Sequence, residues 1–385
     1  MHFHDIQISI GDGHESLGVG LFVALMAVLG GVIGSFLNVV VYRLPRGISL
    51  SYPASRCPRC GHPIRWRDNV PVLGWLLLGG KCRDCRAPIS VRYPLVELTV
   101  AAMFGAFAWL EVVEGGINLP DRALRVSEQP PPQLISHELQ FPGGGSLRFD
   151  SAWSATSIPG QGLLPLERYA FHMLLLAGLL AMALIARDNQ AIPRRLWAPM
   201  LVVGFTLPIA WPLLRPVPLS ASIDASRAAP WWIGFIDGLG GLATGVLLGI
   251  CQILYTRASA AVKSSPPGAA GDRSGAQLAP EAKMSARPML TTVAVFLGAA
   301  SACWVAAGAC VGMLLLRLCD ALRPGHPPRS IAMPMFVATV ALLLVFRWAS
   351  QAFAGLRWDL GLLTVLVALG ARRWFQTLRR ARQVP

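Results

Sequence analysis

The chain has 385 residues, of which 54% are hydrophobic and only 14% are charged. Since an ordinary soluble domain carries about 25% charged residues, this composition excludes a typical soluble enzyme and predicts a membrane protein with several spans. The net charge of +14 is not taken as a sign of nucleic-acid binding. The Lys and Arg residues lie in short segments between apolar runs, a distribution that orients membrane proteins and contacts anionic headgroups. We therefore expect membrane lipid, and no nucleic acid, as a partner.

The first predicted transmembrane helix covers residues 17–42 and the second covers 93–113. Each is long and apolar enough to cross a bilayer. The segment 43–92 between them has ten Lys and Arg residues and two Asp residues, so its local charge is ten minus two, or +8. The excess of positive charge on short loops marks the cytoplasmic side. We expect this segment in the cytoplasm, with the first helix running from outside to inside.

Two Cys-x-x-Cys sequences lie in this basic segment, Cys57 with Cys60 and Cys82 with Cys85. Four thiolates from two tight turns can surround a tetrahedral metal ion, most often zinc. Two disulfides, or four unrelated reduced cysteines, are the alternatives. A reducing cytoplasm favours the metal, and Gly61 permits the tight turn at the first pair. We expect a small zinc-ribbon-like insert in residues 43–92.

The rest of the chain alternates apolar and polar segments. Residues 114–165, rich in Pro, Gly and Ser, are expected to form a mostly irregular extracytoplasmic loop. Residues 166–371 are expected to form a helical membrane bundle with a polar cytoplasmic linker at 256–288, and 372–385 a basic cytoplasmic tail. The predicted helices of the bundle are 166–186, 197–214, 231–255, 289–316 (one tilted helix, or a half-helix followed by a span) and 331–346. The fold class is thus an all-α polytopic membrane protein with about seven or eight transmembrane helices.

Two acids and one pair of glycines stand out within the predicted helices. Glu97 follows the start of the second helix and is expected to pair with a loop arginine or to line a methyl-donor site. Asp237 is expected to bond to a neighbouring helix. Gly241 and Gly245 have the small-xxx-small spacing that allows helices to approach closely.

Three stretches of the chain carry a family resemblance: GSFLNVVVYRLP from Gly34, CPRCGHPIRWRDNVPVLGW from Cys57 and KCRDCRAPISVRYPLVEL from Lys81. They resemble the type IV prepilin peptidases. The resemblance implies a multi-pass enzyme of the bacterial inner membrane that removes the leader from prepilins and pseudopilins and methylates the new N-terminus. It also implies zinc bound by the four cysteines, S-adenosylmethionine as methyl donor, and prepilin or pseudopilin signal segments as partners.

The two aspartates with which this family cuts its substrates are not found at the matching positions. Aligning on Ile192 and Pro193 places Ala186 at the first aspartate, and aligning on residues 296–298 places Ala286 at the second. Two close carboxyls that share a proton are required for aspartic protease chemistry. We therefore expect the endopeptidase activity to be impaired or lost.

Two alternatives stay open. Asp188 lies two residues beyond Ala186, and Asp272 ends a degenerate Gly-x-Gly-Asp sequence at 269–272. These two acids could supply a relocated catalytic pair in an active peptidase. The other alternative is a membrane assembly factor without enzymatic activity, which serves pilus formation or type II secretion.

Overall fold

The computed structural model describes residues 13–114, 118, 135–140, 146–151, 164–211, 214–215, 231–263, 287–298, single positions between 301 and 311, and 332–352. The chain divides into two compact units. The first unit comprises Met1–Ser35, Arg65–Ile117 and Val126–Tyr169. The second comprises Phe36–Ile64, Asn118–Arg125 and Ala170–Pro385.

Long apolar helices dominate the described residues. Helix α1 spans Gly13–Arg43, α3 spans Arg92–Phe107 and continues as a π-helical turn over Ala108–Val113, and α4 spans Leu164–Arg187. Among the described residues, three helical segments are long and apolar enough to cross a membrane: Leu17–Arg46, Arg92–Val113 and Leu166–Arg187. The predicted all-α membrane class is confirmed, whereas the total of seven or eight spans stays a prediction.

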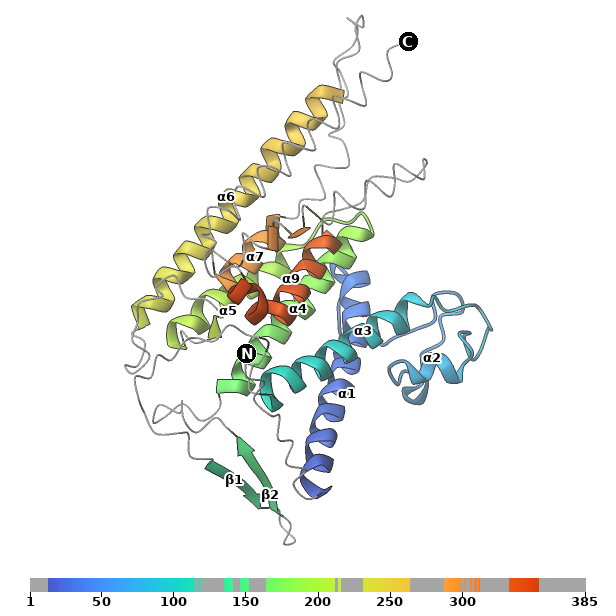
Figure 1. Ribbon diagram of the computed structural model, residues 1–385. Helices are drawn as coiled ribbons and strands as arrows, with labels where there is room; N and C mark the ends of the chain where they lie inside the picture. Colours follow the sequence, from blue (N-terminus) through green and yellow to red (C-terminus); the bar gives the residue numbers. More distant parts are fainter. Residues whose placement is uncertain are drawn as a thin grey trace, which may run out of the picture. The chain divides into compact units, whose positions relative to one another are not determined.

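Glycines allow α1 and α3 to pack closely within the first unit (Figure 1). A Cβ placed on Gly30 would lie 2.7 Å from the backbone oxygen of Val100, and one on Gly34 would lie 2.8 Å from the Cα of Glu97. On the opposite helix, a Cβ on Gly105 would lie 3.3 Å from the Cβ of Ala27. Backbone therefore lies against backbone at this crossing, which excludes lipid between the two helices.

The segment between α1 and α3 consists of short elements joined by turns. It contains the 3₁₀ turns η1 (Leu44–Arg46) and η2 (Trp66–Asp68) and the short helix α2 (Leu73–Leu77). Figure 1 shows α2 beside the N-terminal end of α3. Glycines with positive φ lie in this segment at positions 47, 61, 79 and 80.

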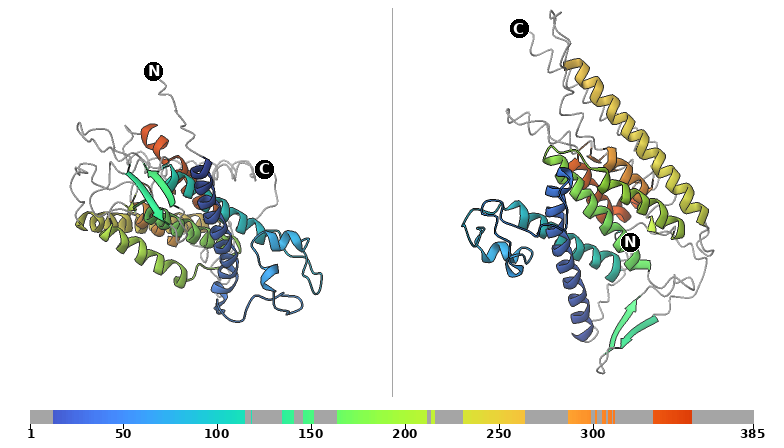
Figure 2. Two further views of the ribbon diagram at one scale, coloured as in Figure 1. Left: turned by 90° about the horizontal axis from the view of Figure 1, so that it is seen from below. Right: turned by 180° about the vertical axis from the view of Figure 1, so that it is seen from behind.

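The second unit contains the remaining helices: α5 (Arg194–Ala210), α6 (Trp231–Lys263), α7 (Arg287–Leu297) and α9 (Ala332–Ala352). Helices α5, α6 and α7 pack against one another, and α6 extends well beyond the other two (Figure 2). A Cβ on Gly241 would meet the backbone oxygen of Ala294 at 2.3 Å, and one on Gly245 the Cα of Thr291 at 2.6 Å. The predicted close helix contact at these two glycines is confirmed.

The structure adds detail to two expectations from the sequence. Within residues 114–165, expected to be mostly irregular, strands β1 (Ile135–Gln140) and β2 (Ser146–Ser151) form an antiparallel hairpin. The missed signal was the Gly-rich run between two short stretches of alternating polar and apolar residues. Of the two alternatives for residues 289–316, the structure favours the half-helix over one tilted helix, since α7 ends at Leu297 and Gly298 takes a left-handed conformation with φ of 88°.

Candidate metal centre

The first cysteine pair sits on a tight turn closed by backbone hydrogen bonds. The amide of Gly61 donates to the carbonyl of Cys57 at 2.9 Å, and the amide of Cys57 donates to His62 at 3.0 Å. Gly61 has φ of 71°, a left-handed conformation that is easy only for glycine. Cys57 and Cys60 therefore both lie on one tight turn, as the sequence predicted.

The second pair repeats this turn almost bond for bond. The amide of Arg86 donates to the carbonyl of Cys82 at 3.0 Å, and the amide of Cys82 donates to Ala87 at 2.8 Å. A bridge between Lys81 and Pro88 matches the bridge between Arg56 and Pro63 in the first turn. The left-handed position that is Gly61 in the first turn is Arg86 in the second, with φ of 57°. Two similar turns thus each offer two thiols.

The four thiols form one cluster. None of the four cysteines is in a disulfide, and their sulfur atoms all lie within 4.8 Å of one another. Zinc–sulfur bonds of 2.3 Å in a tetrahedral site separate the sulfurs by about 3.8 Å, which is compatible with sulfurs that lie within 4.8 Å of one another. A donor set made only of thiols selects zinc or iron–sulfur clusters over calcium or magnesium. The cluster fits a structural metal, and it offers no open position for catalysis.

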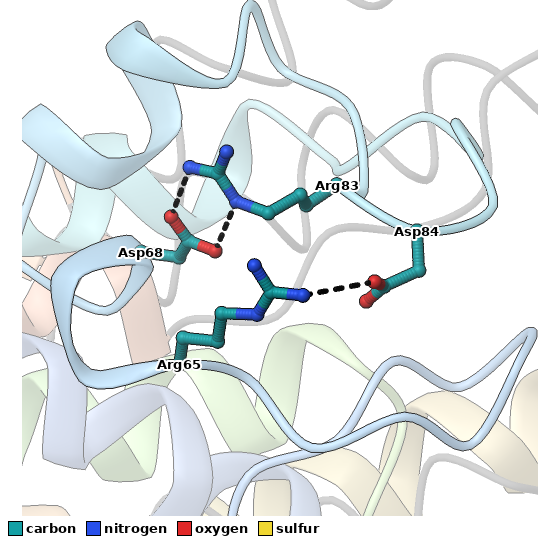
Figure 3. Close-up of polar contacts among 4 residues, drawn as sticks. All are labelled: Arg65, Asp68, Arg83 and Asp84. Atoms are coloured by element: carbon teal, nitrogen blue, oxygen red, sulfur yellow. Dashed lines mark hydrogen bonds and ion pairs between the residues drawn. The ribbon is translucent and has the colours of Figure 1, made fainter.

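Two ion pairs lie beside the second cysteine pair (Figure 3). Arg83, between Cys82 and Cys85, donates two hydrogen bonds to Asp68, from Nε at 2.7 Å and from Nη2 at 2.5 Å. Arg65 lies 3.6 Å from a carboxylate oxygen of Asp84. Both acids that the sequence places in the basic segment are therefore paired with arginine.

The contact between Asp68 and Arg83 shifts the pKa of each group so that its charged form is favoured. The hydrogen bond from Arg83 lowers the pKa of Asp68 below its ordinary value of 3.8. The same bond raises the pKa of Arg83. The side chain of Asp68 is 6% exposed and that of Arg83 is 41% exposed, so the pair is open to water on the arginine side and its strength rests on the bidentate geometry. It fixes the second turn to the 3₁₀ turn η2.

Glu97 bonds to the backbone of the same segment. Its Oε2 accepts a hydrogen bond of 2.7 Å from the amide of Val72. Val72 is a β-branched residue with φ of 62° and ψ of −53°, and the amide of Leu73 donates to Pro71 across it. This is a γ-turn with positive φ, which is rare and strained. Glu97 thus stabilises a strained turn, where the sequence had suggested an arginine partner or a methyl-donor site.

The positions expected for peptidase chemistry are described only in part. Ala186 lies in the last turn of α4 and is 2% exposed. Asp188 follows as the C-terminal cap, since Asn189 is left-handed with φ of 56° and the amide of Gln190 donates to Ile185. Residues two apart on a helix point about 200° apart, so Asp188 does not occupy the place of Ala186. Asp272 and Ala286 lie outside the described residues.

Arg215 is a residue whose importance the sequence did not reveal. Its buried guanidinium donates three hydrogen bonds, to the carbonyls of Val295 at 3.0 Å, Gly234 at 2.7 Å and Gly204 at 3.1 Å. Asp237, itself buried, is near enough for its charge to act on this guanidinium. The three acceptors belong to α7, α6 and α5, so one side chain joins three helices. An arginine at the end of an apolar run has no local signal that separates this role from that of a loop charge.

These features define a class: a helical membrane protein that carries a four-thiol loop between its first two hydrophobic helices. Residues 28–111 match the family model described as the bacterial peptidase A24 N-terminal domain. The chain is similar to prepilin leader peptidase/N-methyltransferases, with 44% identity over 140 residues to that of Myxococcus xanthus and 50% over 90 residues to that of Klebsiella pneumoniae. The similarity to the corresponding protein of Pseudomonas aeruginosa is 32% over 206 residues. The resemblance to type IV prepilin peptidases is confirmed over this part of the chain.

The matches cover only part of each protein. They include 32%, 22% and 48% of this chain and 42%, 40% and 53% of the Myxococcus, Klebsiella and Pseudomonas proteins, respectively. The chain thus spans about half the length of the curated relatives that it matches, or less. No solved structure matches the chain.

Proposed function

We propose that this protein acts on, or binds, the signal segments of prepilins or pseudopilins in the bacterial inner membrane. The observation that carries the proposal is the coincidence of the A24 N-terminal match over residues 28–111 with the four-thiol cluster. The local charge of +8 supports a cytoplasmic location for this loop. Prepilin processing is the activity named for the similar proteins.

The four cysteines Cys57, Cys60, Cys82 and Cys85 are the proposed ligands of a structural zinc ion. Their turns, their separation and their all-sulfur donor set support this assignment. Zinc would hold the two turns together, since ligand binding and folding are coupled in such small sites. In a methyl-transfer step, S-adenosylmethionine would supply the methyl group.

The peptidase half is proposed to be impaired. Ala186, which is buried, offers a methyl group where the family resemblance requires a carboxyl. A methyl group neither activates water nor protonates a leaving amine. Ala286 at the second position would complete the loss. A relocated pair of Asp188 and Asp272, and an assembly factor without enzymatic activity, are the competing proposals.

The test uses the purified full chain in lipid nanodiscs with a prepilin peptide and, separately, with the same peptide already cut. We expect no leader cleavage by the unaltered protein, together with methylation of the cut peptide from S-adenosylmethionine. Cleavage that disappears in Asp188→Asn and in Asp272→Asn would instead establish the relocated pair. Binding of the peptide with neither cleavage nor methylation would establish the assembly factor.

A further inference from the structure

We infer that residues 70–80 form a membrane-inserted wedge whose apolar side chains contact lipid acyl chains of the cytoplasmic leaflet. The apolar wedge, as we name these residues, includes α2 and lies between η2 and the second cysteine turn. The inference concerns where the loop lies, and it holds whether or not the protein cuts or methylates a pilin.

The apolar wedge exposes large side chains that a water-soluble domain would bury. Leu77 is 81% exposed, Leu76 57% and Leu73 56%, all on the single short helix α2. No charged residue occurs between Asp68 and Lys81. A contiguous exposed apolar surface of this kind marks a site of contact with a membrane or a partner.

Contacts within the first unit place the apolar wedge beside the hydrophobic parts of α1 and α3, away from their charged ends. A Cβ on Gly31 would lie 3.3 Å from the Cβ of Pro71, so the proline ring packs on α1 at this level. Gly31 is about 18 Å along the helix axis from Arg43, since a helix rises 1.5 Å per residue. Glu97, which binds the amide of Val72, is about 7–8 Å from Arg92 on the same scale. The apolar wedge therefore contacts α1 and α3 at turns that lie further into the apolar part of each helix than Arg43 and Arg92.

Lipid-exposed irregular backbone does not occur in the hydrocarbon core of a bilayer, because its polar groups would lack partners. The apolar wedge is therefore placed at the boundary between headgroups and acyl chains, where an apolar face can be buried, and most of its amides are paired within the segment. Its amides donate to carbonyls of the same segment at Leu73, Gly74, Leu76, Leu78, Gly79 and Gly80. The amide of Val72 is bound by Glu97, and the indole of Trp75 donates to Ile89 at 3.0 Å. The strained turn at Val72 is understandable on this basis, because it lets the chain reverse while these amides stay paired.

Charges at the base of the apolar wedge suit the headgroup region. Asp68 and Arg83 pair across the two ends of the wedge (Figure 3), and the exposed cations Arg67, Lys81 and Arg86 flank it. Trp66, 85% exposed, adds an aromatic side chain of the kind enriched at membrane interfaces. Basic residues near an anionic leaflet each add to membrane attraction. Apolar tip and cationic base together favour lipid as the occupant over a soluble protein partner.

The test replaces Leu77 with the photocrosslinking residue p-benzoylphenylalanine in the full chain, reconstituted in nanodiscs with anionic phospholipid labelled in the acyl chain. A matched variant carries the same residue at Arg86, which is also exposed but belongs to the cationic base. We expect several-fold more lipid adduct at position 77 than at position 86. Variants at Leu73 and Leu76 provide the same comparison if the first does not retain its metal and its protease resistance.

Equal lipid adducts at positions 77 and 86 would overturn the inference. So would adducts at position 77 that form only with an added prepilin signal peptide, because the apolar wedge would then be a peptide-binding surface. The crosslink is read without any activity assay. A failure of the proposed function would therefore leave the lipid contact intact, and a failure of the lipid contact would leave cleavage and methylation unaffected.

Discussion

At the residue scale, the two cysteine turns differ in one instructive position. Both turns require a left-handed residue directly after the second cysteine, and the chain uses Gly61 in one and Arg86 in the other. A residue with a Cβ pays a conformational penalty of about 1 kcal/mol in this region. The second turn therefore carries strain that the first avoids, and the bond between Arg83 and Asp68 helps to hold it.

Exchanging residues at these two positions gives opposite expected effects. Gly61→Ala should lower the free energy of unfolding by about 1 kcal/mol, because alanine is strained at φ of 71°. Arg86→Gly should be neutral or raise it by up to about 1 kcal/mol, because the left-handed strain is removed. Thermal unfolding of the metal-loaded protein measures both. The expectation would be wrong if Arg86→Gly destabilised the protein as much as Gly61→Ala does. The two turns would then not be equivalent.

The Asp68–Arg83 pair predicts a defined pH dependence. The folded-state pKa of Asp68 is lowered from 3.8, so its stabilising contribution is present above the unfolded value and is lost only as pH falls through the folded pKa. Asp68→Asn should therefore lower the unfolding temperature by the same amount at every pH from 7 to 5. Glu97→Gln, which keeps an oxygen for the amide of Val72, serves as a comparison at a second carboxylate. A difference for Asp68→Asn that shrinks already above pH 5 would contradict the assignment.

At the scale of helices, the α1–α3 contact depends on glycines at particular levels. Gly34 faces the backbone of Glu97, whereas a Cβ on Gly20 of the same helix would meet nothing within 4 Å. Gly34→Ala should destabilise by about 1–3 kcal/mol through overpacking, and Gly20→Ala should be neutral or slightly stabilising, because alanine favours the helix. Unfolding in detergent, followed by circular dichroism, compares the two. Equal effects would mean that the close crossing is unnecessary.

Arg215 carries the second prediction at this scale. Arg215→Ala should destabilise by about 3–5 kcal/mol, because it leaves three buried carbonyls and the charge of Asp237 without their cation. Arg215→Lys should be only partly tolerated, since an ammonium cannot reproduce the planar fork. Arg187→Ala, at an exposed arginine, is the control and should have little effect. A small loss of thermal stability in Arg215→Ala would show that the clamp is dispensable.

At the scale of the whole molecule, the sequence predicted features that depend on local pattern. The lengths of the apolar runs predicted most ends of α1, α3 and α4 to within a few residues. The spacing of the cysteines predicted the two turns whose thiols converge. What it missed depends on partners distant in the chain. The bond from Val72 to Glu97 and the three bonds of Arg215 have no local signature. The peptidase positions stay a prediction, because Asp272 and Ala286 lie outside the described residues.

The dependence of the loop on its metal is the final prediction. The segment 43–92 has only short elements and exposes most of its side chains, so its own core is too small to hold it folded without a metal. Cys57→Ser or Cys85→Ser should therefore release the metal and unfold the cysteine turns. The α1–α3 crossing should persist, because its glycine contacts do not involve the thiols. Metal content by atomic absorption and trypsin cleavage at the loop arginines measure the two effects.

Cys251→Ser, at a cysteine outside the cluster, is the control and should retain both the metal and the resistance to trypsin. A metal-free Cys57→Ser protein with a trypsin-resistant loop would contradict the prediction, and the loop would then be folded by its ion pairs and its contacts with α1 and α3.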